Sequence, residues 1–212
     1  MNIVFLGIQG SGKGTQAELL SKRLRIPIVP VGDLYRKEIA AGTPEGIRAL
    51  RYIKKGRLAP NTLTNEIVRK YLRHLRHSRG VILDGYPRNL VQARASSRVL
   101  KIHAAIHLEM PESLVMARLT GRRVCAKCGA TYHIRWARPK HAGICDRCHG
   151  RLVQRADDTP GAIRKRISIF RTATRPVINY YSKLGVLMVV DGAHSIPVVH
   201  REIAHRLKGA WV

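Results

Sequence analysis

The chain has 212 residues, of which 45% are hydrophobic and 25% charged, so it is long enough to bury a core and too well balanced in composition for wholesale disorder. That length also excludes a small scaffold held together only by disulfides. Lys and Arg number 39 against 13 Asp and Glu, and the formal charge of +26 leaves three interpretations open: an enzyme for phosphorylated substrates, a nucleic-acid binder, or a basic surface of no specific purpose.

Short apolar segments alternate with helical patterns along the chain. Residues 2–6 form an apolar run before a glycine-rich turn, and similar runs, typical of buried parallel strands, cover residues 80–83, 104–108 and 185–190. We expect helices, from the spacing of apolar residues, over 15–24, 62–75, 111–119, 160–181 and 197–207. Strands that alternate with helices predict an α/β fold, with a parallel sheet covered by helices on both faces.

The turn after the first strand has the sequence GIQGSGKGT, residues 7–15, and matches the GxxxxGK pattern of a phosphate-binding loop. In such a loop the backbone N–H groups converge on phosphate oxygens, the following helix adds the positive end of its dipole, and the lysine adds a point charge. Gly14 stands where a hydroxyl residue usually follows the lysine, so we expect no direct hydroxyl ligand to magnesium there. The sequence therefore predicts a P-loop NTPase core with a nucleotide site at this turn.

The four cysteines form two CxxC pairs, Cys125 with Cys128 and Cys145 with Cys148, separated by sixteen residues without a helical period. Two such knuckles can surround one zinc ion with four thiolates, and four sulfur ligands close the coordination shell, so the metal would be structural. Two disulfides or an iron centre are the weaker alternatives. His149 is the best candidate for a ligand outside the four cysteines.

Three further motifs accompany the loop and the cysteines. Residues 32–36 read GDLYR, residues 84–88 read DGYPR with Gln92 four residues later, and Arg122-Arg123 and the RADD of residues 155–158 flank the cysteines. With the GKGT form of the loop, these motifs resemble the nucleoside monophosphate kinases over essentially the full length of the chain, and the adenylate kinase family in particular. The lids of many bacterial members of that family carry a four-ligand zinc site at this place.

The resemblance implies reversible, Mg²⁺-dependent phosphoryl transfer from ATP to AMP, which gives two ADP. It implies a P-loop core of residues 1–29, 60–120 and 159–212, a mobile monophosphate-binding segment at 30–59, and a lid at 121–158 that is stapled by structural Zn²⁺. The lid and the monophosphate-binding segment would close over a site lined by arginines, which stabilise the charge that phosphoryl transfer spreads over the equatorial oxygens.

The resemblance also implies a role for individual residues. The catalytic groups would be Lys13, Asp84, Arg88, Arg123, Arg155 and Arg166, with Asp84 acting on magnesium through water. ATP would contact Gly10, Ser11, Gly12, Lys13, Gly14, Thr15, Arg118, Arg122 and Arg123. AMP would contact Val31, Gly32, Arg36, Arg57, Leu58, Ala59, Gly85, Arg88, Gln92, Arg155 and Arg166. Asp157 and Asp158 would make lid contacts, and Cys125, Cys128, Cys145 and Cys148 would hold the zinc.

Several positions depart from the family pattern or allow two interpretations. Gln9 replaces a common proline in the loop, and Val31 stands where a threonine usually helps to recognise adenine. Loss of that hydroxyl removes a hydrogen bond worth about 0.5–1.5 kcal/mol, which would relax the choice of acceptor base. Asp33 either caps the following helix or contacts a metal-bound water. Pro160-Gly161 is either a hinge or an ordinary helix start.

Two alternative functions differ from strict AMP phosphorylation: a kinase of broader acceptor range, acting on CMP or UMP, and an RNA-associated basic zinc protein. We expect ATP and AMP as partners, nucleic acid at most as a non-specific partner of the basic surface, and a monomer. The apolar runs, such as residues 186–190, are too short to span a bilayer, and the N-terminus has no basic region or cleavage site of a secretory signal. We therefore expect a cytoplasmic protein without a membrane partner.

Overall fold

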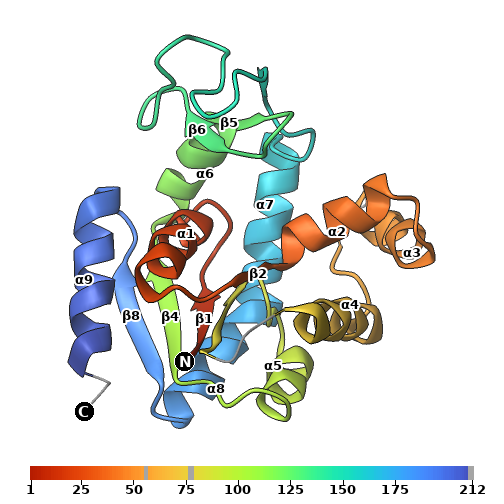
Figure 1. The fold of residues 1–212 in the computed structure, drawn as a ribbon, viewed down its shortest axis with the longest axis vertical. Helices are drawn as coiled ribbons and strands as arrows, with labels where there is room; N and C mark the ends of the chain where they lie inside the picture. The colour runs from red at the N-terminus through yellow and green to blue at the C-terminus, as the bar shows by residue number, and fades with distance from the viewer. Residues whose placement is uncertain (55–56, 76–78, 210–212) are drawn as a thin grey trace.

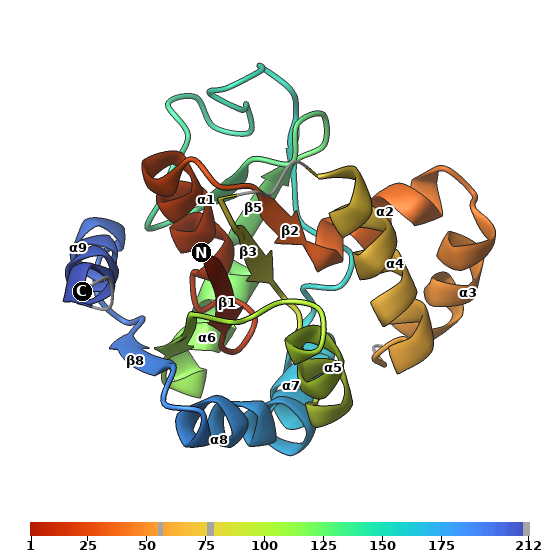
Figure 2. The same cartoon turned by 60° about the horizontal axis from the view of Figure 1, so that its bottom comes forward.

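The computed structural model describes residues 1–54, 57–75 and 79–209. Its largest unit is a five-stranded sheet in the order β2-β3-β1-β4-β8, in which every neighbouring pair is parallel. The strands are β1 (Asn2–Leu6), β2 (Ile28–Pro30), β3 (Val81–Asp84), β4 (Ala104–Glu109) and β8 (Leu187–Asp191). Helices cover both faces of the sheet (Figures 1 and 2). The predicted α/β fold is confirmed.

The two faces of the sheet are packed by different helices. Ile3 and Phe5 of β1 point to the face covered by α1 and α9, whereas Val4 and Leu6 point to the face covered by α4, α5 and α8. These helices are α1 (Lys13–Leu24), α4 (Asn61–His74), α5 (Leu90–Ser97), α8 (Arg175–Lys183) and α9 (Ile196–Gly209). Because successive side chains of a strand point to opposite faces and both faces are covered, the central strands β1, β3 and β4 are mainly apolar.

Two helices project to one side of the sheet after β2, α2 (Val31–Ala40) and α3 (Pro44–Ile53), as Figure 1 shows. Thr43 caps α3, because its hydroxyl accepts a hydrogen bond from the N–H of Gly46 at 3.1 Å. A Cβ on Gly46 would lie 2.2 Å from the carbonyl oxygen of Glu38. Glycine at this position therefore allows α3 to pack directly against α2.

A second, smaller sheet lies beyond α6 (Glu112–Thr120), at the top of Figure 1. Its central strand β5 (Arg122–Cys125) pairs antiparallel with β6 (Thr131–His133) and with β7 (Leu152–Val153). These strands carry residues of the predicted lid, and their shortness explains why the sequence pattern did not reveal them. From here on, "the lid" denotes residues 121–158.

The helix predicted over residues 160–181 is not continuous. A π-helical turn, η1 (Phe170–Thr174), separates α7 (Pro160–Ile169) from α8. Pro176, in the first turn of α8, has no N–H to donate to the preceding turn, so the regular hydrogen bonding lapses there. At the start of α7 the Thr159 hydroxyl accepts from a backbone N–H and proline occupies the first turn, which confirms the helix-start interpretation of that position.

The other predicted helices, over 15–24, 62–75, 111–119 and 197–207, are present with small differences at their ends. The apolar pattern did not predict β2, α2, α3 or α5. Over the described ranges, no helix is long and apolar enough to cross a bilayer.

Candidate active site

The phosphate-binding loop joins the carboxyl end of β1 to the N-terminus of α1, as the sequence predicts. Gly7 has a φ of 140°, and a Cβ there would lie 2.7 Å from the carbonyl oxygen of Leu108 on the neighbouring strand β4. Gly12 has a φ of 94° and is the N-cap residue of α1. Both positions need glycine because a side chain would clash or strain the backbone. The result is a tight loop whose N-terminal helix end is free of side-chain caps.

Lys13 lies across this loop and is held by it. Its Nζ donates hydrogen bonds to the carbonyl oxygens of Gly7 at 2.7 Å and Ile8 at 2.8 Å. Burial lowers the pKa of Lys13 to about 8, the nearby carboxylate of Asp84 acts in the opposite direction, and Arg88 lowers the pKa further. Because the Nζ group is hydrogen-bonded to two carbonyl oxygens, it can exchange them for phosphate oxygens.

Asp84 ends β3, next to the loop. Burial raises the pKa of its carboxyl group, whereas the positive charges of Lys13 and Arg88 lower it. The Asp84 carboxylate lies close to the start of α1, since a Cβ added to Gly14 would be 3.5 Å from one of its oxygens. The structure thus brings Lys13 and Asp84 together at the carboxyl edge of the sheet.

Arginines from four separate segments converge on this edge. Burial lowers the pKa of Arg88, and Arg166 and Arg36 lower it further. Burial, together with Arg122 and Arg36, lowers the pKa of Arg155 to about 10, so its guanidinium stays charged at neutral pH. These mutual effects mean that cations of the predicted lid, of α2, of α7 and of the loop after β3 face one another. Five of the sequence-predicted arginines therefore form one electropositive site: Arg36, Arg88, Arg122, Arg155 and Arg166.

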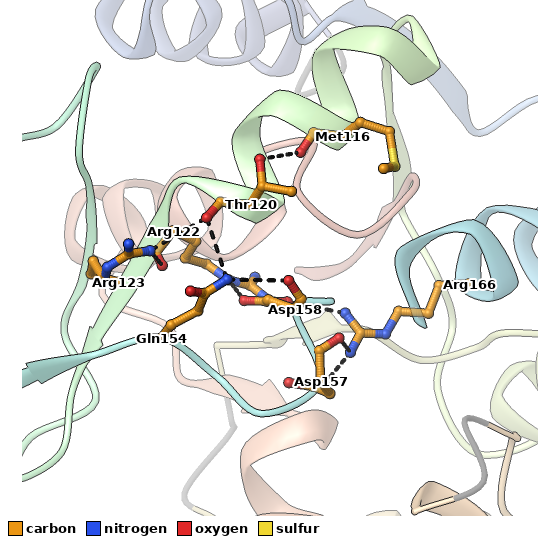
Figure 3. A network of polar contacts seen from close by, with 8 residues as sticks. All are labelled: Met116, Thr120, Arg122, Arg123, Gln154, Asp157, Asp158 and Arg166. Atoms are coloured by element: carbon orange, nitrogen blue, oxygen red, sulfur yellow. Dashed lines mark hydrogen bonds and ion pairs between the residues drawn. The ribbon is translucent and has the colours of Figure 1, made fainter. Parts of the chain in front are cut away.

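Two of these arginines share a buried carboxylate at the base of the lid, drawn in Figure 3. Asp158 is 0% exposed; it accepts hydrogen bonds from Nε and Nη2 of Arg122 at 2.8 and 2.6 Å and from Nη1 of Arg166 at 3.2 Å. Arg166 also pairs with Asp157. Gln154 donates to the backbone oxygens of Thr120 and Asp158. Asp158 therefore joins the lid to α7.

The adjacent residues Arg122 and Arg123 lie on opposite faces of β5, as strand geometry requires. Arg122 acts on the pKa values of Lys13 and Arg155, so it faces the site. Arg123 instead donates to the carbonyl oxygens of Thr120 at 3.3 Å and Arg122 at 2.8 Å. The geometry thus directs Arg122, rather than the Arg123 of the catalytic set, toward the phosphate site.

The residues predicted to bind the acceptor lie along α2 and the loop after β3. Arg36 pairs with Asp33 one turn earlier in α2, and both side chains are half exposed. Asp33 is inside the first turn, since the N-cap residue is Pro30, so the interpretation of Asp33 as a helix cap was wrong. Val31 is 1% exposed and belongs to the core. Gln92 is 1% exposed behind Arg88.

The remaining predicted acceptor contacts lie in the connection between α3 and α4. Arg57 is exposed, Leu58 is partly exposed and Ala59 is buried against the core. Gly32 and Gly85 lie beside the guanidinium groups of Arg36 and Arg88, since a Cβ on either glycine would come within 3.6 Å of its arginine. The glycines leave both arginine side chains room to move.

The four cysteines gather as the CxxC spacing predicts. All four Sγ atoms lie within 4.8 Å of one another, with Cys125 and Cys148 at 3.4 Å and Cys128 and Cys145 at 3.6 Å. Tetrahedral zinc with Zn–S bonds of ~2.3 Å separates its sulfurs by about 3.8 Å, so this donor set fits zinc. In the described part of the chain the cluster does not include His149.

Comparison with known proteins agrees with this geometry. The sequence pattern of the family described as adenylate kinase matches residues 5–186. An adenylate kinase of Moorella thermoacetica is 44% identical over 216 residues, which cover 100% of both chains. Adenylate kinases of Clostridium tetani and Clostridium novyi are 43% and 40% identical, with 98% and 99% of each chain covered. This chain belongs to the adenylate kinase family.

Membership of the adenylate kinase family makes this chain a nucleoside monophosphate kinase, that is, a phosphotransferase. Its four-cysteine lid, its parallel sheet and its phosphate-binding loop are the features that the sequence predicted correctly. They share one property, which is that each leaves a pattern in residues close together in the sequence. Neither the loop nor a CxxC knuckle depends on a distant contact to be recognised.

Sequence reasoning missed two surfaces of this adenylate kinase family member that adjoin Arg118. The turn after β8 lies on the phosphate-binding loop, since a Cβ on Gly192 would come within 3.1 Å of the Ser11 carbonyl oxygen, and Asp191 acts on the pKa of Arg118. In the lid, Trp136 is 48% exposed and stacks on His133, with ring centroids 4.3 Å apart. An exposed tryptophan in a basic segment was the signal available in the sequence.

Proposed function

We propose that this chain catalyses reversible, Mg²⁺-dependent transfer of the γ-phosphoryl group of ATP to AMP, which gives two ADP. The observation that carries the proposal is the convergence of Lys13, Asp84 and Arg88 with Arg122 and Arg155 at one edge of the sheet, where each group shifts the pKa of others. Such a site places the Asp84 carboxylate and several cations beside a phosphate-binding loop. That is the charge pattern that phosphoryl transfer needs.

In the proposed reaction the donor phosphates bind the loop, from Gly10 to Thr15, and Lys13 exchanges the carbonyls of Gly7 and Ile8 for phosphate oxygens. Arg88 and Arg36 hold the phosphate of the acceptor. Arg122, Arg155 and Arg166 lie around the transferring group, where the equatorial oxygens gain charge in the transition state. The AMP phosphate itself is the nucleophile, so no protein side chain needs to form a covalent intermediate.

Asp84 is the residue that fits a magnesium-bound nucleotide. Its carboxylate lies beside the start of α1, and the cations that act on it are the lysine and arginine expected to bind phosphates. Carboxylate oxygens suit Mg²⁺, which keeps most of its water ligands when it binds a nucleotide. The ion would neutralise charge on the phosphates, and Asp84 would hold it through water.

We propose that residues 30–59 and the lid close over a core of residues 1–29, 60–120 and 159–212. Asp158 supports this division, because it connects Arg122 of the lid with Arg166 of the core. A bound nucleotide phosphate would give Arg122 and Arg166 a second anion to bind, in addition to the Asp158 carboxylate at the base of the lid. Closure would exclude water and so prevent transfer of the phosphoryl group to water.

The lid metal is proposed to be one Zn²⁺ held by Cys125, Cys128, Cys145 and Cys148. Backbone N–H groups of Cys128 and Arg147 point at the sulfurs of Cys125 and Cys145, at 3.5 and 3.4 Å, which favours thiolates. Four thiolates leave no open position, so the ion would stabilise the lid and take no part in the reaction.

The donor base is proposed to bind between the turn at residues 191–193 and the Trp136 ring, beside Arg118. The side chain of Arg118 lies next to Gly12 and donates to the Ala193 carbonyl oxygen at 3.4 Å. Burial lowers the pKa of His133, on which Trp136 stacks, and the nearby guanidinium of Arg118 lowers it further. Planar groups on two sides are what a base needs for stacking.

A broader acceptor range is the second candidate function, and Val31 favours it. The valine side chain is buried in the core and offers no hydroxyl to a base. We further propose that the protein acts as a cytoplasmic monomer and binds nucleic acid at most non-specifically. Such binding would fall by orders of magnitude between low and moderate salt.

The test is ADP formation from MgATP with AMP, CMP, UMP, GMP or no acceptor, using protein of known zinc content. We expect turnover with AMP to exceed turnover with every other acceptor. Comparable turnover with CMP or UMP would instead make the chain a kinase of broad acceptor range, and no turnover with any acceptor would overturn the proposal.

Lys13→Met tests the loop itself, with Lys22→Met on the exposed side of the same helix as the matched control. Loss of a positive group that stabilises transition-state charge costs about 100- to 1,000-fold in kcat. We expect that loss for Lys13→Met and less than a twofold change for Lys22→Met. Equal activity of both variants would contradict the assigned role of the loop lysine.

A further inference from the structure

Three side-chain amides form a chain of hydrogen bonds behind Arg88. Nε2 of Gln92 donates to Oδ1 of Asn61 at 3.1 Å, and Nδ2 of Asn89 donates to the same oxygen at 2.8 Å. Asn61 begins α4, Asn89 is the N-cap residue of α5, and Gln92 lies in the first turn of α5. Asn61 therefore connects two helices through a single carbonyl oxygen.

Backbone N–H groups fix the orientation of every amide in this chain. The N–H of Arg88 can only donate, so the Gln92 atom that faces it at 2.8 Å must be Oε1. Nε2 then faces Asn61, and since an amide nitrogen can only donate, the Asn61 atom must be Oδ1. Asn89 must likewise present Nδ2 to Asn61, which leaves its Oδ1 to accept from the N–H of Gln92 at 3.0 Å. One arrangement satisfies all four bonds.

The frame around these amides is firmly held. Gln92 is 1% exposed, so its amide cannot exchange protein partners for water. The carbonyl oxygen of Arg88 accepts a hydrogen bond from the hydroxyl of Thr174 in the π-helical turn at 2.9 Å, and Nε of Arg88 donates to the Gly85 carbonyl oxygen at 2.8 Å. Turning the Gln92 amide by 180° would set Nε2 against the Arg88 N–H and Oε1 against the Asn61 carbonyl. Both contacts would be repulsive.

The fixed orientation of the Gln92 amide, called the lock below, matters for the acceptor base. Its importance rests on the proposed function, in which Arg88 binds the acceptor phosphate and Gln92 binds its base. When Arg88 holds the phosphate, the orientation of the ribose determines which atoms of the base contact Oε1 and Nε2 of Gln92. A 6-amino purine offers an amino donor and a ring-nitrogen acceptor, which complement an amide carbonyl and an amide NH₂. A 6-oxo purine offers the reverse pattern and complements the turned amide.

We propose that Asn61 is a positioning residue that sets acceptor specificity by holding the Gln92 amide in the orientation that suits an amino base and rejects an oxo base. The lock discriminates by hydrogen-bond pattern and not by ring size, since cytosine shares the amino-donor and ring-acceptor pattern of adenine. A smaller base must be rejected by other contacts.

The experiment compares AMP with IMP, two acceptors of the same shape whose donor and acceptor atoms are exchanged at the recognised edge. Asn61→Leu removes the shared acceptor oxygen, and Asn61→Asp retains acceptor oxygens for both Gln92 and Asn89. Asn65→Leu, the same change one turn later in α4, removes instead the acceptor of the Tyr86 hydroxyl at 2.8 Å and is the matched control. For each variant the ratio of kcat/KM for AMP to that for IMP is measured with MgATP.

We expect Asn61→Leu to lower the AMP-to-IMP ratio by about 3- to 10-fold, the effect of one neutral hydrogen bond. Asn61→Asp and Asn65→Leu should keep the ratio within about twofold of the unchanged protein. An unchanged ratio in Asn61→Leu, with lower thermal stability alone, would make Asn61 merely structural and overturn the proposal.

A further variant covers the case in which Asn61→Leu does not fold. Asn89→Asp keeps the cap of α5 but replaces the Nδ2 donor by a carboxylate oxygen, which repels the Asn61 carbonyl and turns it away from Gln92. It should lower the ratio in the same direction, and an unchanged ratio would count against the lock.

Calorimetric titration of AMP and IMP separates this inference from the proposed function. Without any turnover in the unchanged protein the proposed function fails, yet the ratio of the two Kd values in the same variants still tests the lock. If AMP binds no more tightly than IMP to the unchanged protein, or if neither binds, the inference fails as well.

Discussion

The core and the lid are held together by different forces. Both faces of the parallel sheet carry clusters of buried aliphatic side chains, and α1, α4, α5, α8 and α9 cover them. The buried cluster of the lid consists of Cys125, Ala130, Cys145 and Leu152, so half of it is sulfur ligand. Trp136 of the lid is 48% exposed. The core is stabilised by burial, whereas a segment the size of the lid has too little core to fold without a metal.

We expect this difference to divide the site into a part formed by packing and a part that depends on the proposed lid metal. Lys13 and Asp84 lie at the ends of elements fixed by the sheet, so the core presents them whatever the lid does. Arg122 and Arg155 belong to the lid, so we expect their positions to depend on the cysteine cluster, and Asp158 also holds Arg122. The five predictions below test this division, from the largest expected effect to the smallest.

Removal of the lid metal should have the largest effect. In Cys125→Ser combined with Cys128→Ser, we expect stoichiometric zinc to be lost and kcat to fall by at least about 100-fold, because the lid arginines are no longer held. Hydrogen exchange should show loss of protection in β5, β6 and β7 with protection kept in β1, β3 and β4. A lid that stays protected without metal would contradict the division.

The buried carboxylate at the lid base should come next. Asp158→Asn leaves Arg122 and Arg166 without their shared counter-charge, and breaking a buried pair costs about 3–5 kcal/mol. We expect that loss in the free energy of urea unfolding. Asp157→Asn is the matched control: its carboxylate also pairs with Arg166 but is 51% exposed, so it should cost at most about 1 kcal/mol. Equal losses would show that burial of Asp158 does not matter.

The pH dependence of MgATP binding should report on the core part of the site. Because burial lowers the pKa of Lys13 from 10.5 to about 8, the free protein loses this charge above about pH 8, and affinity should then fall by up to ~10-fold per pH unit. Calorimetry in buffers of different ionisation enthalpy should detect proton uptake on binding near pH 8.5.

The lowered pKa of Lys13 has the opposite effect on stability, which should rise with pH where the affinity for MgATP falls. Since the folded pKa of Lys13 lies below the unfolded one, its burial destabilises the folded state fully below about pH 8, and this cost is relieved as the pH rises toward 10.5. The slope should be absent in Lys13→Met. A slope equal in both proteins would assign the titration to another group.

The smallest effect should come from the surface contact between lid and core. Arg147 of the second knuckle pairs with Glu18 of α1 at 3.4 Å, and the two side chains are 62% and 53% exposed. Exposed pairs contribute about 0–1 kcal/mol and are screened by salt. Arg147→Gln should change kcat less than twofold at 0.15 M salt, and a larger change would mean that this contact holds the lid.

Signals carried by neighbouring residues allowed much of the fold and site to be predicted. The apolar runs of β1, β3 and β4 reflect burial on both faces, whereas β8 lies at the edge of the sheet and its Val189 is 42% exposed. The glycines of the loop reflect backbone angles that other residues avoid. β2 has three residues and η1 arises from a single proline, so neither leaves a periodic pattern. The role of Asp33 as a cap was wrong because the helix begins two residues earlier.

By itself the sequence determined the phosphate-binding loop, the α/β layering and the metal-binding cysteines, because each depends on local spacing that the backbone converts directly into geometry. The tertiary structure alone decided which of Arg122 and Arg123 lies near Lys13 of the loop, that Asp158 is buried between two arginines, and that Asn61 contacts Gln92, 31 residues away. Those contacts come from the packing of separate elements. The order of residues along the chain does not show which polar atoms, distant in sequence, will be buried together and form hydrogen bonds with one another.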